Sequence, residues 1–305
     1  MTSGDRMRPF PFIVACGRSG TTLLRAMLER GGQIAIPPES YFPVSLHRRH
    51  WRSAFDPVAF ADDLGANVRF REWGMPVPDL SGVADYADAV RSVYAAYAST
   101  AGADRYGDKT PPFVLHMELL AGLFPEARFV HVVRDGRDVA RSLVQTSFGP
   151  NRLARAAEVW TRRVTAGRAS GARLGPERHL EVRYESLVGE PAATLRSVCA
   201  FLELEFGDEM LHPEDAEMLL PEGERAHHAN LAMPVTPGLR DWRRDMPDAD
   251  VALVEAVAGD LLSELGYERR FPKVPLVARG RAVASRARSA VTRSGRRTAR
   301  TVVRR

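Results

Sequence analysis

The sequence of 305 residues is poor in cysteine and contains no long apolar run. Its two cysteines, Cys16 and Cys199, are far apart, so we expect no disulfide framework and a reducing compartment. No stretch reaches the roughly 18 consecutive apolar residues of a membrane-spanning helix. The N-terminal segment has no apolar core of the length that a signal peptide needs. These absences predict a cytoplasmic protein.

Acidic residues are missing from one end of the chain. Residues 279–305 contain ten arginines and no Asp, Glu or Lys, so this segment accounts for more than the whole net charge of +5. We expect residues 273–305 to form a basic, Arg-rich tail that is disordered or weakly helical, and that makes weak contact with an anionic membrane. No nucleic-acid recognition motif accompanies the charge, so we expect no nucleic-acid partner.

The chain also lacks the lysine of a standard nucleotide-binding loop. Residues 12–24 read F-I-V-A-C-G-R-S-G-T-T-L-L, a run of strand length, a glycine turn and the start of a helix. A helix N-terminus binds phosphate or sulfate through its unpaired amides. A nucleoside-triphosphate loop needs Lys after the second glycine, but Thr21 follows Gly20 here and Arg18 supplies the charge. The loop predicts an anion held without a metal, although such glycine turns also occur for steric reasons alone.

Strand and helix patterns alternate along the rest of the chain. Apolar runs predict further strands at Arg128–Val133 and His179–Glu185, and helical patterns cover Ala192–Leu202 and Asp250–Leu265. This alternation is typical of an α/β fold with a central parallel sheet flanked by helices. The functional site of such a fold lies at the carboxyl ends of its strands.

Three of the expected strands end in polar residues. The first leads into the Arg18 loop, the second to Arg134 and Ser142, and the third to Arg183 and Tyr184. An Arg and a Ser placed across a strand-to-helix turn can both reach one phosphate. Local ion pairs, such as Arg134 with Asp135 or Lys109 with Asp108, are the alternative interpretation of the individual residues.

Together the motifs resemble those of sulfotransferases that use 3′-phosphoadenosine 5′-phosphosulfate (PAPS), most closely the tyrosylprotein sulfotransferases and their bacterial relatives. The resemblance rests on G-R-S-G-T-T-L-L-R-A-M-L and R-F-V-H-V-V-R-D-G-R-D-V-A-R-S-L, with weaker support from R-Y-E-S-L-V-G-E-P and V-T-P-G-L-R-D-W. It implies a P-loop-like three-layer α/β fold, with residues 1–272 as the sulfotransferase domain. It also implies transfer of a sulfuryl group from PAPS to an acceptor hydroxyl, which leaves 3′,5′-ADP.

The resemblance implies which residues bind the cofactor. The 5′-phosphosulfate is expected to contact Arg18, Ser19, Gly20, Thr21 and Thr22, and the 3′-phosphate is expected to contact Arg134 and Ser142. Tyr184 is expected near the nucleotide, and Trp242 lies in the segment that covers the cofactor in this family. No metal ion is expected. Arg240 stands where the tyrosylprotein branch has a Ser, and its role stays open.

The resemblance also implies a catalytic base. Small-molecule sulfotransferases carry a catalytic His directly after a K-T pair, but Pro111 follows Lys109 and Thr110 in this chain. In the tyrosylprotein branch the base is a Glu that follows the first helix, and Glu39 corresponds to it. We therefore expect Glu39 to take the proton of the acceptor, while Arg18 and Lys109 stabilise the charge on the leaving group.

Other functions and several partners stay open at this point. A P-loop-type small-molecule kinase would need the missing Lys and a Mg²⁺-binding acid; a catalytically silent nucleotide-binding or scaffold protein is a further alternative. The acceptor hydroxyl belongs to a phenol, a sugar or alcohol, a lipid headgroup or a tyrosyl peptide, and a cytoplasmic location favours a small molecule. The segments expected to line its pocket, Tyr41–Asp79 and Pro221–Pro237, carry no motif, and the oligomeric state cannot be read from the sequence.

Overall fold

The computed structural model describes residues 8–51, 54–216, 219, 235–236, 238 and 241–285. Arg240, most of Pro221–Pro237 and the tail beyond residue 285 lie outside the described residues. No helix in the described part of the chain is both long enough and apolar enough to span a bilayer.

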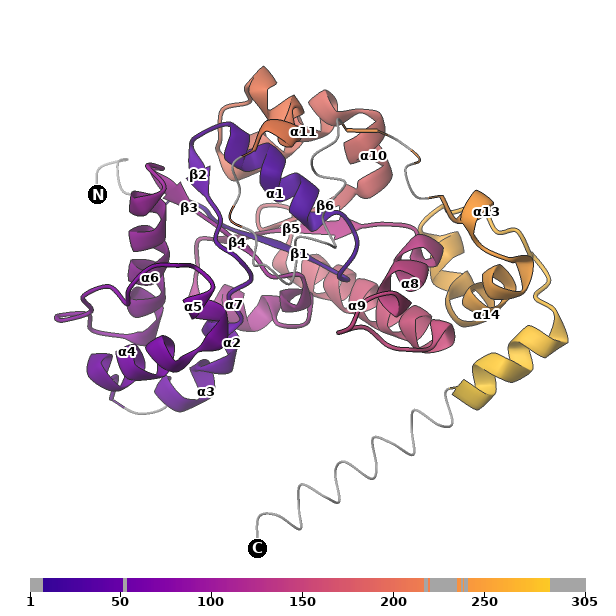
Figure 1. Cartoon of the computed structure of the whole chain (residues 1–305), viewed down its shortest axis with the longest axis horizontal. Helices are drawn as coiled ribbons and strands as arrows, with labels where there is room; N and C mark the ends of the chain where they lie inside the picture. The colour runs from indigo at the N-terminus through magenta and orange to yellow at the C-terminus, as the bar shows by residue number, and fades with distance from the viewer. Residues whose placement is uncertain are drawn as a thin grey trace, which may run out of the picture. The chain divides into compact units, whose positions relative to one another are not determined.

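A four-stranded parallel sheet forms the centre of the fold (Figure 1). Its strands are β1 (Phe10–Ala15), β4 (Asp108–Lys109), β5 (Ala127–Val133) and β6 (His179–Arg183), in the order β4-β1-β5-β6. Each neighbouring pair runs in the same direction. Two very short strands, β2 (Ile34–Ala35) and β3 (Arg105–Tyr106), pair separately. The predicted α/β fold with a central parallel sheet is confirmed.

Helices cover both faces of this sheet. Successive residues of β1 point to opposite faces: Phe10, Phe12 and Val14 join one apolar cluster, and Ile13 and Ala15 join another. The first cluster is covered by α2 (Phe42–Ser45), α4 (Pro57–Ala66), α5 (Val68–Arg71), α6 (Tyr86–Thr100) and α7 (Met117–Leu123). The second is covered by α1 (Thr21–Arg30), α10 (Tyr184–Gly189) and α11 (Pro191–Leu202). The fold therefore has the three layers that the resemblance implied.

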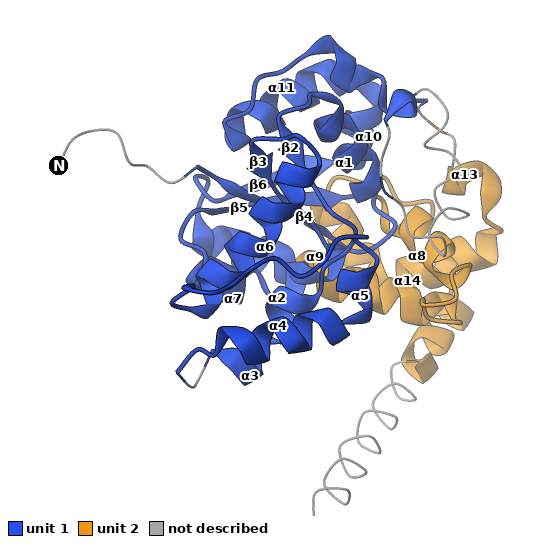
Figure 2. Ribbon diagram, turned by 60° about the vertical axis from the view of Figure 1, so that its left-hand side comes forward, with its two compact units in different colours: residues 1–133, 166–237 blue, residues 134–165, 238–305 orange. Residues whose placement is uncertain are grey.

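The chain divides into two compact units, shown in different colours in Figure 2. Unit 1 comprises residues 1–133 and 166–237 and contains both sheets, whereas unit 2 comprises residues 134–165 and 238–305. Unit 2 contains α8 (Gly136–Val144), α13 (Trp242–Asp245), α14 (Asp248–Glu264) and a helical stretch at 276–285. One division falls within the long helix α9 (Leu153–Leu174) and another directly after β5. The motif at residues 128–143, expected to bind the 3′-phosphate, thus begins in unit 1 and continues in unit 2.

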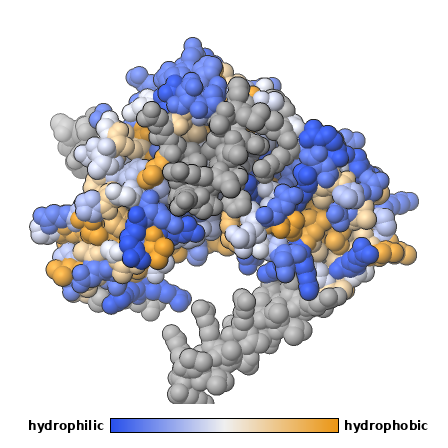
Figure 3. Space-filling model, in the orientation of Figure 1, coloured by the Kyte–Doolittle hydropathy of each residue, from blue (hydrophilic) through white to orange (hydrophobic). Residues whose placement is uncertain are grey.

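Most element bounds agree with the sequence patterns. The strand predicted at Arg128–Val133 is β5, and the helix predicted at Asp250–Leu265 is α14, followed by Gly266 with a φ of 75°. The segment after β3 contains β4 and the 3₁₀ helix η1 (Pro111–Leu115). The remaining short elements of the described chain are α3 (His47–His50), η2 (Asp208–Leu211) and η3 (Pro213–Asp215). On the face drawn in Figure 3, apolar residues form small groups among hydrophilic ones, as is usual for a protein surface.

Candidate functional site

The glycine loop after β1 is held by its own side chains. Ser19 Oγ donates a hydrogen bond to the Cys16 carbonyl at 2.6 Å, which closes the turn. Gly20 is the N-cap of α1 with a φ of 93°, and a Cβ there would lie 2.4 Å from a ring carbon of Tyr184. Glycine is required at this position both by the left-handed backbone and by the close ring. Tyr184 therefore lies against the loop, and its contact with the nucleotide stays a prediction.

The first amides of α1 meet no side-chain cap. Because the N-cap is a glycine, it has no side chain to accept a hydrogen bond from them. Thr21 and Thr22 begin the helix and are buried. These amides, with the positive end of the helix dipole, form a site suited to an anionic group.

Arg18 has an unusual backbone conformation. Its φ is 73°, and only Tyr41 and Glu203 share a positive φ among the described residues other than glycine. A non-glycine residue in such a region costs roughly 1–3 kcal/mol, and such strain concentrates at functional sites. Two of these three residues, Arg18 and Tyr41, stand in or beside the predicted site.

Glu39 and Lys109, two predicted catalytic residues that are far apart in sequence, form an ion pair. Lys109 Nζ donates to Glu39 Oε1 at 3.0 Å, and Tyr41 Oη donates to Glu39 Oε2 at 2.9 Å. Lys109 is 1% exposed, whereas Glu39 retains 18% of its side-chain surface. The alternative pairing of Lys109 with Asp108 is not the one observed. The structure thus joins the expected base to the expected cation.

The pKa of Glu39 is lowered. Burial acts against ionisation, but the charge and hydrogen bond of Lys109 and the hydrogen bond of Tyr41 outweigh it, and Arg69 adds a smaller effect in the same direction. Glu39 is therefore ionised at neutral pH, as a proton acceptor must be.

A buried carboxylate fixes the backbone around this pair. Asp108 Oδ2 accepts hydrogen bonds from Ser40 Oγ at 2.6 Å, Tyr94 Oη at 2.6 Å and Thr110 Oγ1 at 3.2 Å. Thr110 Oγ1 also accepts from the Ser40 backbone amide at 3.0 Å. Burial raises the pKa of Asp108, although these hydrogen bonds partly oppose the shift. Because Ser40 follows Glu39 and Asp108 precedes Lys109, the network ties together the two segments that carry the ion pair.

A second contact holds the other end of the Glu39 loop. Glu29, on α1, accepts a hydrogen bond from the Ile36 backbone amide at 2.8 Å. Its other oxygen pairs with Arg25 at 3.0 Å. The loop that carries Glu39 is thus anchored on both sides.

In unit 2, Arg134 and Ser142 are buried on and next to α8. They are 6% and 5% exposed. Trp160 Nε1 donates to the Arg134 carbonyl at 3.0 Å, and the indole lies so close to Gly136 that a Cβ there would be 2.8 Å from it. Trp160, which belongs to none of the sequence motifs, therefore shapes the turn that presents Arg134.

Arg134 pairs with Asp138 one helical turn further on. Arg134 Nη2 and Asp138 Oδ2 are 3.4 Å apart. Burial raises the pKa of Asp138 to about 6, and Asp135 adds to this effect, while Arg134 and the backbone amide of Trp242 oppose it. Asp138 Oδ1 accepts no hydrogen bond from the residues that the structure describes. This carboxylate can gain a proton in mildly acidic solution.

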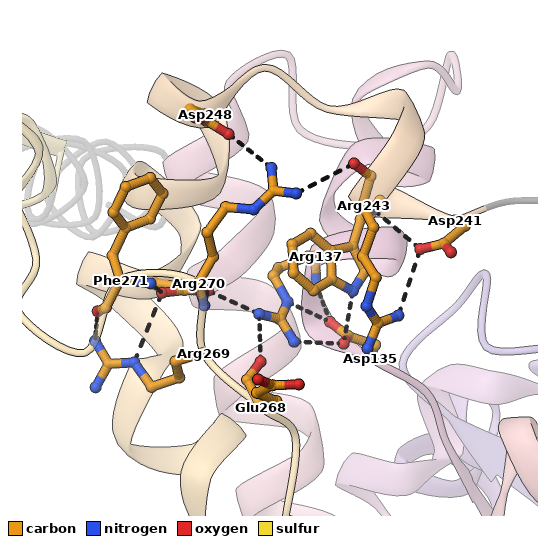
Figure 4. Close-up of polar contacts among 11 residues, drawn as sticks. Asp135, Arg137, Asp241, Arg243, Asp248, Glu268, Arg269, Arg270 and Phe271 are labelled. Carbon is orange, nitrogen blue, oxygen red and sulfur yellow. Dashed lines mark hydrogen bonds and ion pairs between the residues drawn. The ribbon is translucent and has the colours of Figure 1, made fainter.

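Trp242 packs against the buried Arg137 in unit 2. Its Nε1 donates to Asp135 Oδ2 at 3.0 Å, and the Arg137 guanidinium lies 3.6 Å from the centre of its ring. Figure 4 shows Arg137 binding Asp135 and the Glu268 carbonyl, and Arg137 also pairs with the fully buried Glu255 at 2.7 Å. The contact of Trp242 with a cofactor stays a prediction. No sequence pattern indicates the pairing of Arg137 with Glu255, because the two residues are 118 positions apart and no motif links them.

Several known proteins are similar to this chain. A model of the sulfotransferase family matches residues 9–208. Protein-tyrosine sulfotransferase A of Caenorhabditis elegans is 26% identical over 281 residues, which cover 87% of this chain and 68% of that protein. Nodulation protein NoeE of Sinorhizobium fredii is 29% identical over 307 residues, which cover 91% of this chain and 71% of that protein.

A solved structure shares the fold. The sulfotransferase domain of the Synechococcus olefin synthase superposes with a TM-score of 0.60 at 24% identity, and the match covers 88% of this chain and 98% of that domain.

Proposed function

The chain belongs to the sulfotransferase family and is a sulfuryl-transferring enzyme, and we propose that it takes the sulfuryl group from PAPS and passes it to an acceptor hydroxyl. The family match spans the glycine loop, Glu39, Lys109 and the Arg134 motif. Family membership disfavours the kinase alternative. We also keep the cytoplasmic location as a prediction.

We place the two ends of PAPS on the two motifs. The 5′-phosphosulfate binds the amides and threonine hydroxyls at the start of α1 together with Arg18, and the ring of Tyr184 packs beside this loop. The 3′-phosphate binds Arg134 and Ser142, with Trp242 as a further nucleotide contact. The support is the uncapped helix start, the strained backbone of Arg18 and the buried positions of Arg134 and Ser142.

The observation that carries the proposed chemistry is the pairing of Glu39 with Lys109 at 3.0 Å. The acceptor oxygen attacks sulfur, its proton passes to a carboxylate oxygen of Glu39, and the bond between sulfur and the 5′-phosphate oxygen breaks. The electron pair of that bond leaves with 3′,5′-ADP, whose new charge Arg18 and Lys109 stabilise. These fixed cations take the role that a metal ion has in phosphoryl transfer.

Lys109 has two partners in this scheme. As it turns toward the charge on the leaving group, its attraction for Glu39 weakens. Loss of that attraction raises the pKa of Glu39 and makes it a stronger base when the proton is released. The ion pair therefore links removal of the acceptor proton by Glu39 to stabilisation of the leaving group by Lys109.

The acceptor is the least defined partner. Two relatives differ in what their names state: one is a protein-tyrosine sulfotransferase and the other a nodulation protein. We propose a hydroxyl-bearing acceptor, either a small molecule or a tyrosyl residue. A screen of hydroxylated compounds with labelled PAPS would identify its class.

Binding of the product nucleotide tests the proposal. We expect 3′,5′-ADP, but not 5′-AMP, to raise the melting temperature of the wild-type protein. Arg134→Ala removes a charged contact to the 3′-phosphate, and we expect it to weaken the affinity by about 10- to 100-fold in a calorimetric titration.

Arg281→Ala, which removes an exposed arginine of the same unit, is the matched control and should bind as the wild type does. A wild-type protein that 3′,5′-ADP does not stabilise would contradict the use of PAPS.

A further inference from the structure

Both carboxylate oxygens of Glu39 have a donor, and the two donors differ in kind. Lys109 binds Oε1 at 3.0 Å and carries a charge, whereas Tyr41 binds Oε2 at 2.9 Å with a neutral hydroxyl. The proposed reaction draws Lys109 toward the leaving group. Nothing in the proposed reaction draws the Tyr41 hydroxyl away from Glu39, so it can keep its hydrogen bond throughout.

The backbone of Tyr41 is forced into the conformation that allows this contact. Its φ of 53° and ψ of −30° are unusual for a residue with a Cβ. On one side, Ser40 is anchored to Asp108 and Thr110; on the other, the Phe42 amide donates to the Ser40 carbonyl at 2.6 Å. Such strain persists only where the surrounding contacts impose it. The contacts around Tyr41 thus select a conformation in which its side chain meets a carboxylate two residues earlier.

The ring of Tyr41 is packed on two sides. It meets Phe113 edge-on, with ring centres 6.3 Å apart, and the Arg69 guanidinium lies 5.6 Å from its centre. These contacts restrict the ring and hence the direction of its hydroxyl. A hydroxyl with a fixed direction can hold one carboxylate oxygen in place.

We propose that Tyr41 is a positioning residue that holds the Glu39 carboxylate in its catalytic orientation while Lys109 serves the leaving group. This inference rests on the proposed function, because it needs Glu39 as the base. Tyr41 does not exchange a proton with the acceptor. It keeps Oε2 fixed, so that the carboxylate cannot rotate away when Lys109 loosens its hold on Oε1.

The role has a consequence for pH dependence. The groups that face Glu39 are Lys109 and Asp108 on β4, Arg69 on α5 and Tyr41 itself. A hydrogen bond donated to a carboxylate favours its ionised form. Removing that donor raises the pKa of Glu39, so the acidic limb of the rate profile moves to higher pH.

Tyr41→Phe tests the proposal, since it removes one hydroxyl and keeps the ring that packs against Phe113. We expect kcat to fall about tenfold, KM for PAPS to stay within about twofold, and the acidic limb of kcat to move to higher pH. Tyr106→Phe is the matched control, because it removes the hydroxyl of another partly buried tyrosine of unit 1. It should leave kcat and the pH profile unchanged.

Two further measurements keep the outcomes distinct. Melting temperatures and 3′,5′-ADP binding of both variants, assayed well below their melting points, separate a folding defect from a catalytic one. If Tyr41→Phe equals the wild type in kcat and in pH profile, the positioning role is wrong and the sulfotransferase proposal stands. If kcat falls but the acidic limb does not move, Tyr41 supports the fold and does not act through Glu39. A wild-type protein that neither binds 3′,5′-ADP nor transfers sulfate overturns the proposed function itself.

Discussion

Two partly buried pairs of a carboxylate and a cation, one in each unit, behave in opposite ways. Glu39 and Lys109 in unit 1 lie 3.0 Å apart, and the pKa of the carboxyl is lowered. Asp138 and Arg134 in unit 2 lie 3.4 Å apart, and the pKa of the carboxyl is raised to about 6. Both pairs contain residues that the sequence assigned to the reaction or to the nucleotide. An adjacent cation therefore does not decide the ionisation of a buried acid by itself.

Hydrogen bonds and neighbouring charges explain the difference. Burial opposes ionisation in both pairs. Glu39 receives donors on both oxygens, from Lys109 and Tyr41. Asp138 stands near a second acid, Asp135, and one of its oxygens lacks a hydrogen-bond partner among the described residues. Glu39 is therefore held in its ionised form, whereas Asp138 can take up a proton near neutral pH.

Glu39→Gln breaks the first pair most directly. The amide cannot take a proton, so we expect kcat to fall by about 10²- to 10⁴-fold. The affinity for 3′,5′-ADP should stay near that of the wild type, because the proposed scheme gives Glu39 no contact with the nucleotide. Steady-state kinetics and calorimetric titration check the two parts. Glu177→Gln, at an exposed position of unit 1, is the control. A fully active Glu39→Gln enzyme would show that Glu39 is not the catalytic base.

Lys109→Met keeps the length of the side chain and removes its charge. We expect kcat to fall by about 10²-fold because the leaving group loses a cation. Without Lys109 the pKa of Glu39 rises, so the acidic limb of the pH–rate profile should move to higher pH. Lys273→Met, at the other lysine of the chain, should change neither quantity. A lower kcat with an unmoved acidic limb would show that Lys109 does not act on Glu39.

Asp138→Asn gives the smallest effect and tests the second pair. In the proposed placement of the 3′-phosphate on Arg134, ionised Asp138 would compete with that phosphate above about pH 6, and protonation or the Asn substitution would end the competition. We expect the variant to bind 3′,5′-ADP about three- to tenfold more tightly at pH 7.5 and equally at pH 5. The phosphates of the ligand titrate in the same range, so the quantity to compare is the difference between the two proteins. Weaker binding by the variant at pH 7.5 would mean that Asp138 orients Arg134 instead.

The same substitution bears on stability. Because the pKa of Asp138 is raised in the folded state, its protonated form favours folding, and that contribution is lost as the pH rises through about 6. Asp138→Asn should therefore flatten the loss of stability between about pH 4 and pH 7.

Long and strongly patterned elements could be predicted from the sequence. The strands β5 and β6 and the helix α11 agree with their predicted ranges to within two residues, because their apolar residues recur at the period of the element. The edge strand β4 could not be predicted, since its two residues, Asp108 and Lys109, carry no pattern. It is defined by its pairing with β1 alone.

The candidate site, too, could be predicted from the sequence only in part. The sequence named Glu39 and Lys109 separately, through a family resemblance, but nothing in it shows that they bind each other across 70 residues. The role of Tyr41 could not be predicted from the sequence, because it depends on a strained backbone angle and a fixed ring, which are properties of the folded chain. Arg137 and Trp160 act through packing against Trp242 and Gly136, and such contacts leave no local signature.

The anchoring of Ser40 to Asp108 and Thr110 has a consequence for how activity arises during folding. These contacts join residues 68 and 70 positions apart, so they belong to the long-range part of the contact order. Closing such a loop is costly in entropy and tends to follow local helix formation. Helices can therefore be present before the Glu39 loop meets the edge strand. On refolding, the recovery of enzymatic turnover should then lag behind the recovery of the helical circular dichroism signal. Turnover therefore measures the formation of the complete sheet, which the helical signal does not.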